Sequence, residues 1–271
     1  MKPVAFDYAI PTDVAEAVSL LAADPDGAKV VAGGQSLGPM LNLRLAQPSL
    51  LVDVRRIDGM TCVRESGDCI EIGACVTHSA IEDGAIPGAV GRFMREVARD
   101  IAYRAIRNRG TIGGSLCHAD PAADWVSVLQ LLSATVAIHG VAGSRDVPAS
   151  AFMSSAFSTV LNASELVVAI RVPVLSVSAR WSYRKFCRKP GEFAEALACV
   201  LVDPVHDVCR AVIGATDGCP LRIDDARLLL SVHDEGTIRE VLARADLNED
   251  AYAAQLRYVM VSRALAALDS A

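Results

Sequence analysis

The sequence predicts an α+β fold whose organisation changes near Pro173. Before that proline, short apolar runs of strand type alternate with helical segments. Between Pro173 and residue 221, three apolar runs follow one another with turn signals between them, which is typical of antiparallel strands. Helical patterns then continue to the end of the chain. We therefore expect two domains, residues 1–174 and residues 175–271.

Local signals predict each element of the first region. Pro11–Asp13 marks a helix start, and Asp24–Gly27 ends that helix. Glu65–Asp68 supplies a hairpin turn, and Thr77 can cap a short helix. The predicted helices are 14–21, 37–45 (a helical turn), 78–81, 88–99 and 121–132. The predicted strands are 29–32, 50–53, the hairpin 60–74, 134–139 and 166–172.

The second region is predicted to contain three antiparallel strands followed by a helical end. The strands are 180–186, 195–202 and 208–215, separated by turn signals such as His206-Asp207. Helices are expected at 224–230, 236–245 and 249–268. The last helix repeats apolar residues on one face, which is typical of a helix that closes a domain.

Composition excludes several classes of function. The chain has 271 residues, of which 52% are hydrophobic, so it can build a substantial core. Its net charge of −6 argues against nonspecific nucleic-acid binding, which needs a basic surface. No apolar run approaches the ~20 residues of a membrane span, and the first residues lack the apolar segment of a signal peptide. We therefore expect a cytoplasmic protein without a membrane span.

The residue pattern points to neither a metal site nor a catalytic constellation. Eight cysteines are present, but none form the C-x-x-C pairs of zinc or ferredoxin sites. We expect them to be reduced and mostly structural. His78 and His118 have no ligand cluster at metal spacing, and we interpret them as partly buried histidines. No Ser-His-Asp, Cys-His or paired-carboxylate arrangement is evident.

Two glycine-rich segments are the most informative feature of the chain. They are Ala32-Gly33-Gly34-Gln35-Ser36 and Thr111-Ile112-Gly113-Gly114-Ser115. Neither fits the G-x-G-x-x-G or the G-x-x-x-x-G-K-[ST] pattern. Glycine lets backbone approach a ligand closely, and successive N–H groups can form an anion nest. Each segment alone could be a tight turn, whereas the pair suggests that the two grip a dinucleotide diphosphate from both sides.

The longer motifs around these segments resemble a known family. Ala32–Leu37 resembles the first FAD-binding signature of the medium subunits of molybdenum hydroxylases, the xanthine dehydrogenase and aerobic carbon monoxide dehydrogenase group. Arg107–Leu116 resembles the second signature, and His118–Asp124 continues it. Similar stretches extend nearly end to end, at 43–46, 51–53, 72–74, 77–78, 183–185 and 262–265.

The resemblance implies a fold, a cofactor and a complex. The fold would be a two-subdomain FAD-binding region of the vanillyl-alcohol oxidase (PCMH) type, followed by a smaller flavoprotein C-terminal domain. The partners would be a large molybdenum-cofactor subunit and a small subunit with two two-iron two-sulfur clusters, assembled as a dimer of heterotrimers. Electrons would pass from molybdenum through the clusters to FAD on this chain, and then to an external acceptor.

The glycine segments and the resemblance together give the expected FAD contacts. Val30, Val31 and Ala32 would lie on the adenosine side, and the glycine segments would hold the diphosphate. Leu166 and Lys185 fall where the family approaches the isoalloxazine ring. The full set is Val30, Val31, Ala32, Gly33, Gly34, Gln35, Ser36, Leu37, Thr77, Thr111, Ile112, Gly113, Gly114, Ser115, His118, Asp120, Asp124, Leu166 and Lys185.

Some of these roles have simpler alternatives. Asp124 either accepts hydrogen bonds from ribityl or flavin groups or is a helix-start carboxylate that favours the helix dipole. Lys185 either stabilises anionic reduced flavin near its N1–C2 edge or is an ordinary surface lysine. Asp120 would fix the second segment. The basic residues Arg104, Arg107 and Arg109 form either a partner-docking face or a solvated helix face.

Two other functions compete with the electron-transfer subunit. One is a freestanding FAD-dependent reductase that uses a nicotinamide. The other is an assembly subunit that has lost FAD, against which the intact glycines and hydroxyl groups of both segments argue.

Overall fold

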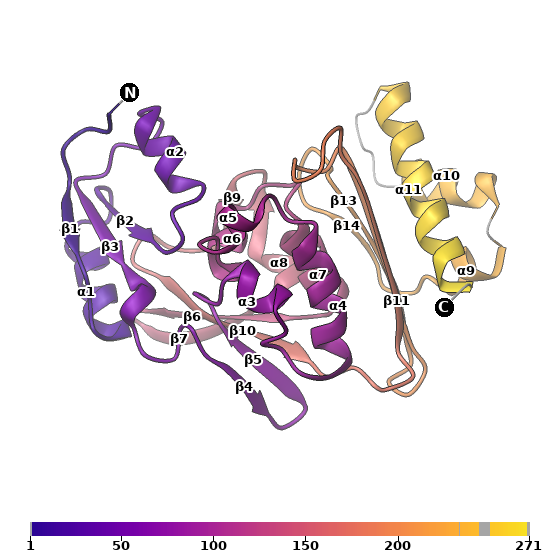
Figure 1. Ribbon diagram of the computed structural model, residues 1–271, viewed down its shortest axis with the longest axis horizontal. Coiled ribbons are helices and arrows are strands. Elements are labelled where there is room, and N and C mark those ends of the chain that lie inside the picture. Colours follow the sequence, from indigo (N-terminus) through magenta and orange to yellow (C-terminus); the bar gives the residue numbers. More distant parts are fainter. Residues whose placement is uncertain (1, 233, 244–249, 270–271) are drawn as a thin grey trace.

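The computed structural model describes residues 2–232, 234–243 and 250–269. Three sheets follow one another along the long axis of the molecule (Figure 1). The mixture of helices and strands agrees with the α+β fold that the sequence predicts. No helix in the described part of the chain is long and apolar enough to cross a membrane.

The N-terminal sheet has three parallel strands in the order β1-β3-β2. They are β1 (Asp7–Ala9), β2 (Ala28–Val31) and β3 (Leu50–Asp53), and β3 leads into the short 3-10 helix η1 (Val54–Arg56). Helix α1 (Val14–Ala23) begins where the Asp13 side chain accepts the Glu16 N–H, as expected of an N-cap. The first glycine segment follows β2 and leads into α2 (Leu37–Asn42).

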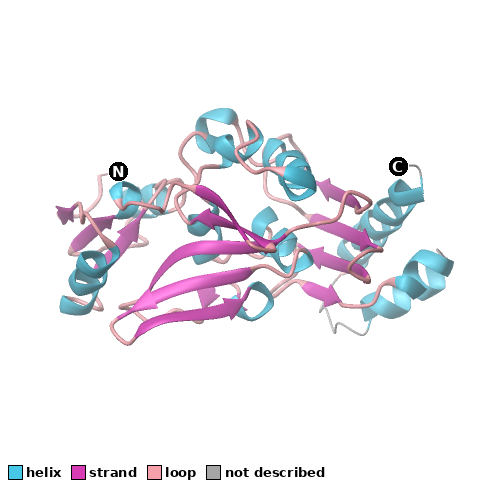
Figure 2. Cartoon of the chain, turned by 90° about the horizontal axis from the view of Figure 1, so that it is seen from below, coloured by secondary structure: helices cyan, strands magenta, loops and turns pink. Residues whose placement is uncertain are grey.

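The middle sheet has five antiparallel strands in the order β4-β5-β10-β6-β7. They are β4 (Val63–Ser66), β5 (Cys69–Gly73), β6 (Thr135–Gly140), β7 (Gly143–Pro148) and β10 (Leu166–Pro173). The region also contains α3 (His78–Glu82), α4 (Gly88–Arg99), α5 (Arg104–Arg107), α6 (Ile112–His118), α7 (Asp124–Leu131), α8 (Ala149–Phe152) and the hairpin β8 (Met153–Ser155) and β9 (Ser158–Thr159). Its helices lie on one face of the sheet, and Figure 2 shows the strands from the opposite side.

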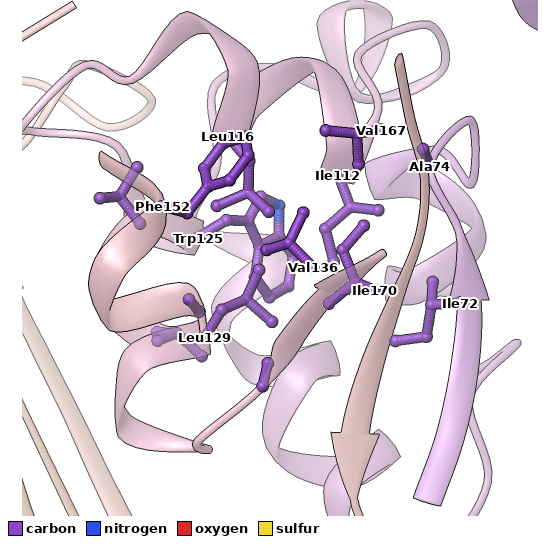
Figure 3. Packing of buried hydrophobic residues seen from close by; sticks show 14 of the residues in the cluster. Ile72, Ala74, Ile112, Leu116, Trp125, Leu129, Val136, Phe152, Val167 and Ile170 are labelled. Carbon is purple, nitrogen blue, oxygen red and sulfur yellow. The ribbon is translucent and has the colours of Figure 1, made fainter. Parts of the chain in front are cut away.

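The main core lies between these helices and the middle sheet (Figure 3). Trp125 and Leu129 of α7 pack there with Ile112 of α6, and Ile170 of β10 closes the cluster from the sheet; all four are fully buried. Burying an aliphatic side chain of this size stabilises the fold by about 1.5–3 kcal/mol. This packing fixes α6 and α7, which carry the second glycine segment and Asp124.

The C-terminal sheet has four antiparallel strands in the order β11-β12-β13-β14. They are β11 (Arg180–Phe186), β12 (Ala196–Asp203), β13 (Val208–Gly214) and β14 (Leu221–Ile223). Strand β12 is buried on both faces: Leu197 and Cys199 belong to the main core with α7, while Ala196 and Ala198 face a second core with α11. The helical end consists of α9 (Arg227–Val232), α10 (Glu235–Ala243) and α11 (Ala251–Asp269).

Several elements differ from the sequence prediction. The C-terminal sheet has a fourth strand, β14, where three were expected, and β1, β7, β8 and β9 were not predicted. The second glycine segment is the start of helix α6 rather than a loop. The predicted helix 121–132 begins at Asp124. Residues 244–245 and 249, at the ends of two predicted helices, lie outside the described residues. The boundary at 174/175 falls between β10 and β11, and two separate domains remain a prediction.

Candidate functional site

A cavity of about 760 Å³ lies among all three parts of the chain. Its wall is built from β2 and the first glycine segment, from α6 and the start of α7, and from the strand end and loop that follow β11. Every predicted site residue lines it except Thr77, Ile112 and Asp120: these are Val30, Val31, Ala32, Gly33, Gly34, Gln35, Ser36, Leu37, Thr111, Gly113, Gly114, Ser115, His118, Asp124, Leu166 and Lys185. Residues distant in sequence therefore share one site.

Thr77, Ile112 and Asp120 do not line the cavity and have contacts elsewhere in the fold. Thr77 caps α3 by accepting the Ala80 N–H at 3.2 Å. Ile112 is fully buried in the main core. The Asp120 carboxylate accepts the Ala122 N–H at 2.9 Å, in the turn between α6 and α7. The FAD contacts expected of Thr77 and Ile112 stay a prediction, as does the expected role of Asp120 in fixing the second segment.

The two glycine segments lie in direct contact although they are far apart in sequence. A Cβ on Gly33 would lie 2.1 Å from the Arg109 carbonyl oxygen and 2.8 Å from Gly110 Cα. A side chain larger than hydrogen at position 33 would therefore collide with backbone that cannot move aside locally. Glycine at this position is what allows the two segments to meet at the cavity wall.

The first segment presents free backbone donors. Gly34 has a φ of +70°, a conformation that favours glycine. The backbone N–H groups of Gly34, Gln35, Ser36 and Leu37 donate to no acceptor within the described part of the chain. The Gln35 amide folds back onto the Gly33 carbonyl oxygen at 2.9 Å. A turn with successive unpaired N–H groups is the geometry of an anion nest.

The second segment differs from the expected nest. The Ile112 and Gly113 N–H groups donate to the Val76 and Ala74 carbonyl oxygens. Gly114 donates to the Thr111 hydroxyl at 3.1 Å, and the Ser115 N–H donates to the Thr111 carbonyl. These four donors are used within the fold, so the second segment has no row of free N–H groups like that of the first, and its predicted backbone contact with a diphosphate stays a prediction. Gly113 instead permits close packing, because a Cβ there would lie 2.6 Å from Ala74 Cβ.

Hydroxyl groups remain available on both segments. Ser36 and Ser115 are half-buried, line the cavity, and make no side-chain hydrogen bond to another described residue. The buried Thr111 hydroxyl accepts the Gly114 N–H as an N-cap, and its own hydrogen stays free to donate. The cavity wall therefore offers hydroxyl donors beside the free N–H groups of the first segment.

A buried ion pair forms another part of the wall. Lys185 Nζ lies 3.0 and 3.3 Å from the two carboxylate oxygens of Asp124, and both side chains are only 5% exposed. Nζ also donates to the Asp100 carbonyl oxygen at 3.0 Å, and the Tyr183 hydroxyl donates to Asp124 Oδ1. Burial raises the pKa of Asp124, whereas Lys185 and Tyr183 oppose that rise. The interpretation of Lys185 as a surface lysine is wrong, and Asp124 is both a cavity group and the first residue of α7.

The two cavity histidines have different surroundings. His118 packs against the Phe157 ring with centroids 5.3 Å apart. His78 is buried, and its Nδ1 accepts the indole N–H of Trp125 at 3.1 Å. Burial, helped by the nearby Arg107 cation, lowers the pKa of His78 to about 4. His78 is therefore neutral near pH 7.

The basic residues before the second segment do not form a free cationic face. Arg107 is buried and pairs with Glu82 at 2.8 Å. Arg104 pairs with both Glu82 and Asp83. Arg109 is exposed. Neighbouring carboxylates thus offset the charge of Arg104 and Arg107. The three arginines therefore do not act as one cluster, either as a partner-docking face or as a solvated helix face.

Sequence reasoning missed several parts of the cavity wall. Two of these parts are loops that only tertiary structure brings to the cavity, Ile101–Tyr103 and Gly191–Phe193. Tyr103 and Phe193 are exposed aromatic side chains at this wall, a signal that sequence alone does not separate from core residues. Further lining residues that were not predicted are Lys29, Pro39, Met40, Val54, Met60, Ala74, Cys75, His78, Ile106, Gly110, Cys117, Ala123, Leu161, Glu165 and Val167.

The donor set suits an anionic dinucleotide better than a metal ion. In the described part of the chain, no three His, Cys, Asp or Glu side chains gather as metal ligands, and all eight cysteines are free. Unpaired N–H groups and hydroxyls form one part of the wall, while a buried ion pair and apolar side chains form another. Together they fit a ligand with a charged middle and flat apolar ends, such as FAD.

Comparison with known proteins agrees with this interpretation. Residues 4–175 match the family described as the FAD binding domain in molybdopterin dehydrogenase. The nicotine 6-hydroxylase medium subunit of Paenarthrobacter nicotinovorans is 34% identical over 263 residues, covering 96% of this chain and 90% of the relative. The carbon monoxide dehydrogenase medium chain of Hydrogenophaga pseudoflava is 39% identical over 202 residues, covering 74% and 70%.

Comparison of the fold with solved structures points to the same family. A chain in the crystal structure of carbon monoxide dehydrogenase from Hydrogenophaga pseudoflava superposes with a TM-score of 0.86 and 30% identity, covering 100% of this chain and 99% of that one. The chain therefore belongs to the FAD-binding medium subunits of the molybdenum hydroxylase family, as its glycine signatures indicate.

Proposed function

We propose that this chain carries FAD between the iron–sulfur clusters of a partner subunit and an external electron acceptor. The observation that carries the proposal is the row of free N–H groups from Gly34 to Leu37. They follow Gly33, which packs against Gly110, and they line a cavity that also contains a buried lysine. When bound, FAD would supply the two-electron chemistry, and the protein would position it and tune its potential.

The first glycine segment would hold the diphosphate. Its free N–H groups donate to phosphate oxygens without bringing a net charge, and the Ser36 hydroxyl adds a donor beside them. In the second segment, Thr111 and Ser115 would contribute hydroxyls, while Gly114 leaves room for the ligand. Val30, Val31 and Ala32 would line the adenosine side.

The buried pair would serve the isoalloxazine end. Lys185 supplies a positive charge to the cavity wall, which Leu166 also lines, and Asp124 holds that ammonium in place. A fixed cation favours negative charge that develops beside it, and its effect is strong where water is excluded. No residue of this chain would act on the substrate of the complex.

The relatives support a place within a larger assembly. They are named medium subunit and medium chain. We propose a large molybdenum-cofactor subunit and a small subunit with two two-iron two-sulfur clusters as the partners, in a dimer of heterotrimers. Eight free cysteines fit a reducing compartment, and we place the complex in the cytoplasm.

Co-purification with genome neighbours tests the proposal. The tagged chain should bring two other chains, show flavin absorption, and release about one FAD per chain in acid. Gly114→Leu should abolish flavin retention, because its side chain would enter the cavity beside Thr111. Gly218→Leu is the matched control, since a Cβ there meets nothing within 4 Å and the position does not line the cavity.

The same preparation separates the competing functions. Turnover of a reduced nicotinamide by the isolated flavin-loaded chain, with no partner bound, would favour a freestanding reductase and contradict the proposal. A complex that contains this chain but no flavin would favour an assembly subunit.

A further inference from the structure

His78 lies where the two glycine segments meet. It is the first residue of α3, it is 6% exposed, and it lines the cavity. A Cβ on Gly110 would lie 3.0 Å from His78 Nε2, and a Cβ on Gly33 would lie 2.8 Å from Gly110 Cα. The imidazole and Gly33 of the first segment therefore both pack closely against Gly110. Backbone reinforces this placement, since the His78 N–H donates to the Gly110 carbonyl oxygen at 2.9 Å.

The hydrogen bond from Trp125 determines which ring nitrogen of His78 carries the proton. An indole N–H can only donate, so the Nδ1 atom that receives it at 3.1 Å must present a lone pair. A neutral imidazole then carries its proton on Nε2. That N–H makes no hydrogen bond to another described residue. Trp125 is fully buried in the main core, so the donor is held rigidly.

The surrounding charges favour the neutral ring. Burial and the Arg107 cation on α5 lower the pKa of His78 to about 4. Glu82, on the same helix as His78, is paired with Arg107, and Asp124 of α7 is paired with Lys185. A second proton on Nδ1 would also face the indole donor, which has no lone pair to accept it.

We infer that His78 is a further FAD-binding residue, which donates through Nε2–H, as a neutral imidazole fixed by Trp125, to an oxygen of the FAD diphosphate. This inference rests on the proposed function. It adds one oriented donor to the free N–H groups of the first segment, from a residue that neither signature contains. The neutral state of the His78 ring has a measurable consequence. A donor that stays neutral adds no pH dependence to FAD affinity, whereas a ring that becomes an imidazolium would add one.

Trp125 would act as a positioning residue in this arrangement. Trp125→Phe keeps an aromatic ring in the core but removes the donor to Nδ1. Without that donor, the neutral ring can carry its proton on Nδ1 instead of Nε2, so the Nε2 donor is no longer fixed. The FAD affinity of this variant should therefore fall toward that of a His78 variant that has no donor. The wild-type affinity should stay constant between about pH 5 and 8.

The experiment combines binding with a direct observation of the ring. FAD, and ADP as a competitor that shares the diphosphate, are titrated into the flavin-free full chain, together with its partners if it needs them. His78→Phe should weaken both ligands by about tenfold, the effect of one lost hydrogen bond. His78→Gln, whose amide can still donate, should recover most of the loss. Nitrogen-15 NMR of histidine-labelled wild-type chain should show His78 protonated on Nε2 alone from pH 5 to 8.

Each outcome bears on one proposal. If the wild-type chain and its complex bind no FAD, the proposed function fails. If they bind FAD but His78→Phe binds it equally well, only this inference is overturned. A proton on Nδ1, or titration of His78 near pH 6.5 in the wild type, would overturn it even if His78→Phe does not fold.

Discussion

Replacing Lys185 by methionine should leave the buried carboxylate of Asp124 without its cationic partner. Lys185 and Asp124 are each 5% exposed, and their charged atoms are 3.0 Å apart at the closest contact. Removing one partner of such a pair costs about 3–5 kcal/mol, because the remaining ion lies where water cannot solvate it. We expect Lys185→Met to lower the free energy of unfolding by about this amount. The Tyr183 hydroxyl, which also donates to Asp124, would offset part of the loss.

The loss should depend on pH in a defined direction. Burial raises the pKa of Asp124 in the folded chain, and without the lysine this rise is less opposed. The unfolded carboxyl titrates near pH 3.9, so between that value and the raised folded pKa the folded state binds more protons. Stability of the variant should therefore fall as pH rises through this window. Lys185→Met should be more destabilised at pH 8 than at pH 5.

Urea denaturation of the flavin-free chain, followed by circular dichroism at both pH values, measures the effect. Lys189→Met is the matched control, since Lys189 is exposed. The double variant Asp124→Asn with Lys185→Met removes both charges and should be more stable than Lys185→Met alone. The reasoning is refuted if Lys185→Met is as stable as the Lys189 control at both pH values, or if the double variant loses at least the sum of the single losses.

Two further changes test other parts of the account. Gly33→Ala places a Cβ 2.1 Å from the Arg109 carbonyl oxygen and should weaken FAD binding by about tenfold or more. Gly38→Ala is the control, because a Cβ there meets nothing within 4 Å, and it should leave binding unchanged. Equal dissociation constants of the two variants in fluorescence titrations would contradict this. Burial raises the pKa of Asp53, but hydrogen bonds from Arg55 and Tyr8 outweigh that rise and bring the pKa to about 2. The carboxylate therefore stabilises the fold above about pH 4, and this stabilisation is lost as pH falls through 2. Asp53→Asn should flatten this acid dependence in urea titrations between pH 2 and 5, and an unchanged slope would count against the assignment.

The glycine segments could be predicted from sequence because their chemistry is local. Adjacent glycines and hydroxyls indicate backbone that can approach a ligand closely, and Gly33 and Gly34 line the cavity in the structure. The partner of each N–H group could not be predicted. The donors of Ile112 and Gly113 are taken by Val76 and Ala74, and nothing in the segment itself signals that contact.

The roles of Lys185 and His78 depend on long-range packing. From its charge alone, Lys185 is expected at the surface. In the structure it is buried and pairs with Asp124, which is distant in sequence, in the cavity wall. His78 depends in the same way on Trp125. Strand β7 was missed because Gly143–Pro148 is largely polar and edges the middle sheet, and β14 because it has only three residues.

The most direct test of the central claim is the FAD content of the chain purified with its partners. The account predicts about one FAD released by acid per chain, together with iron–sulfur absorption that follows the copurifying small subunit. An intact complex without releasable flavin, which also fails to take up added FAD, would contradict it.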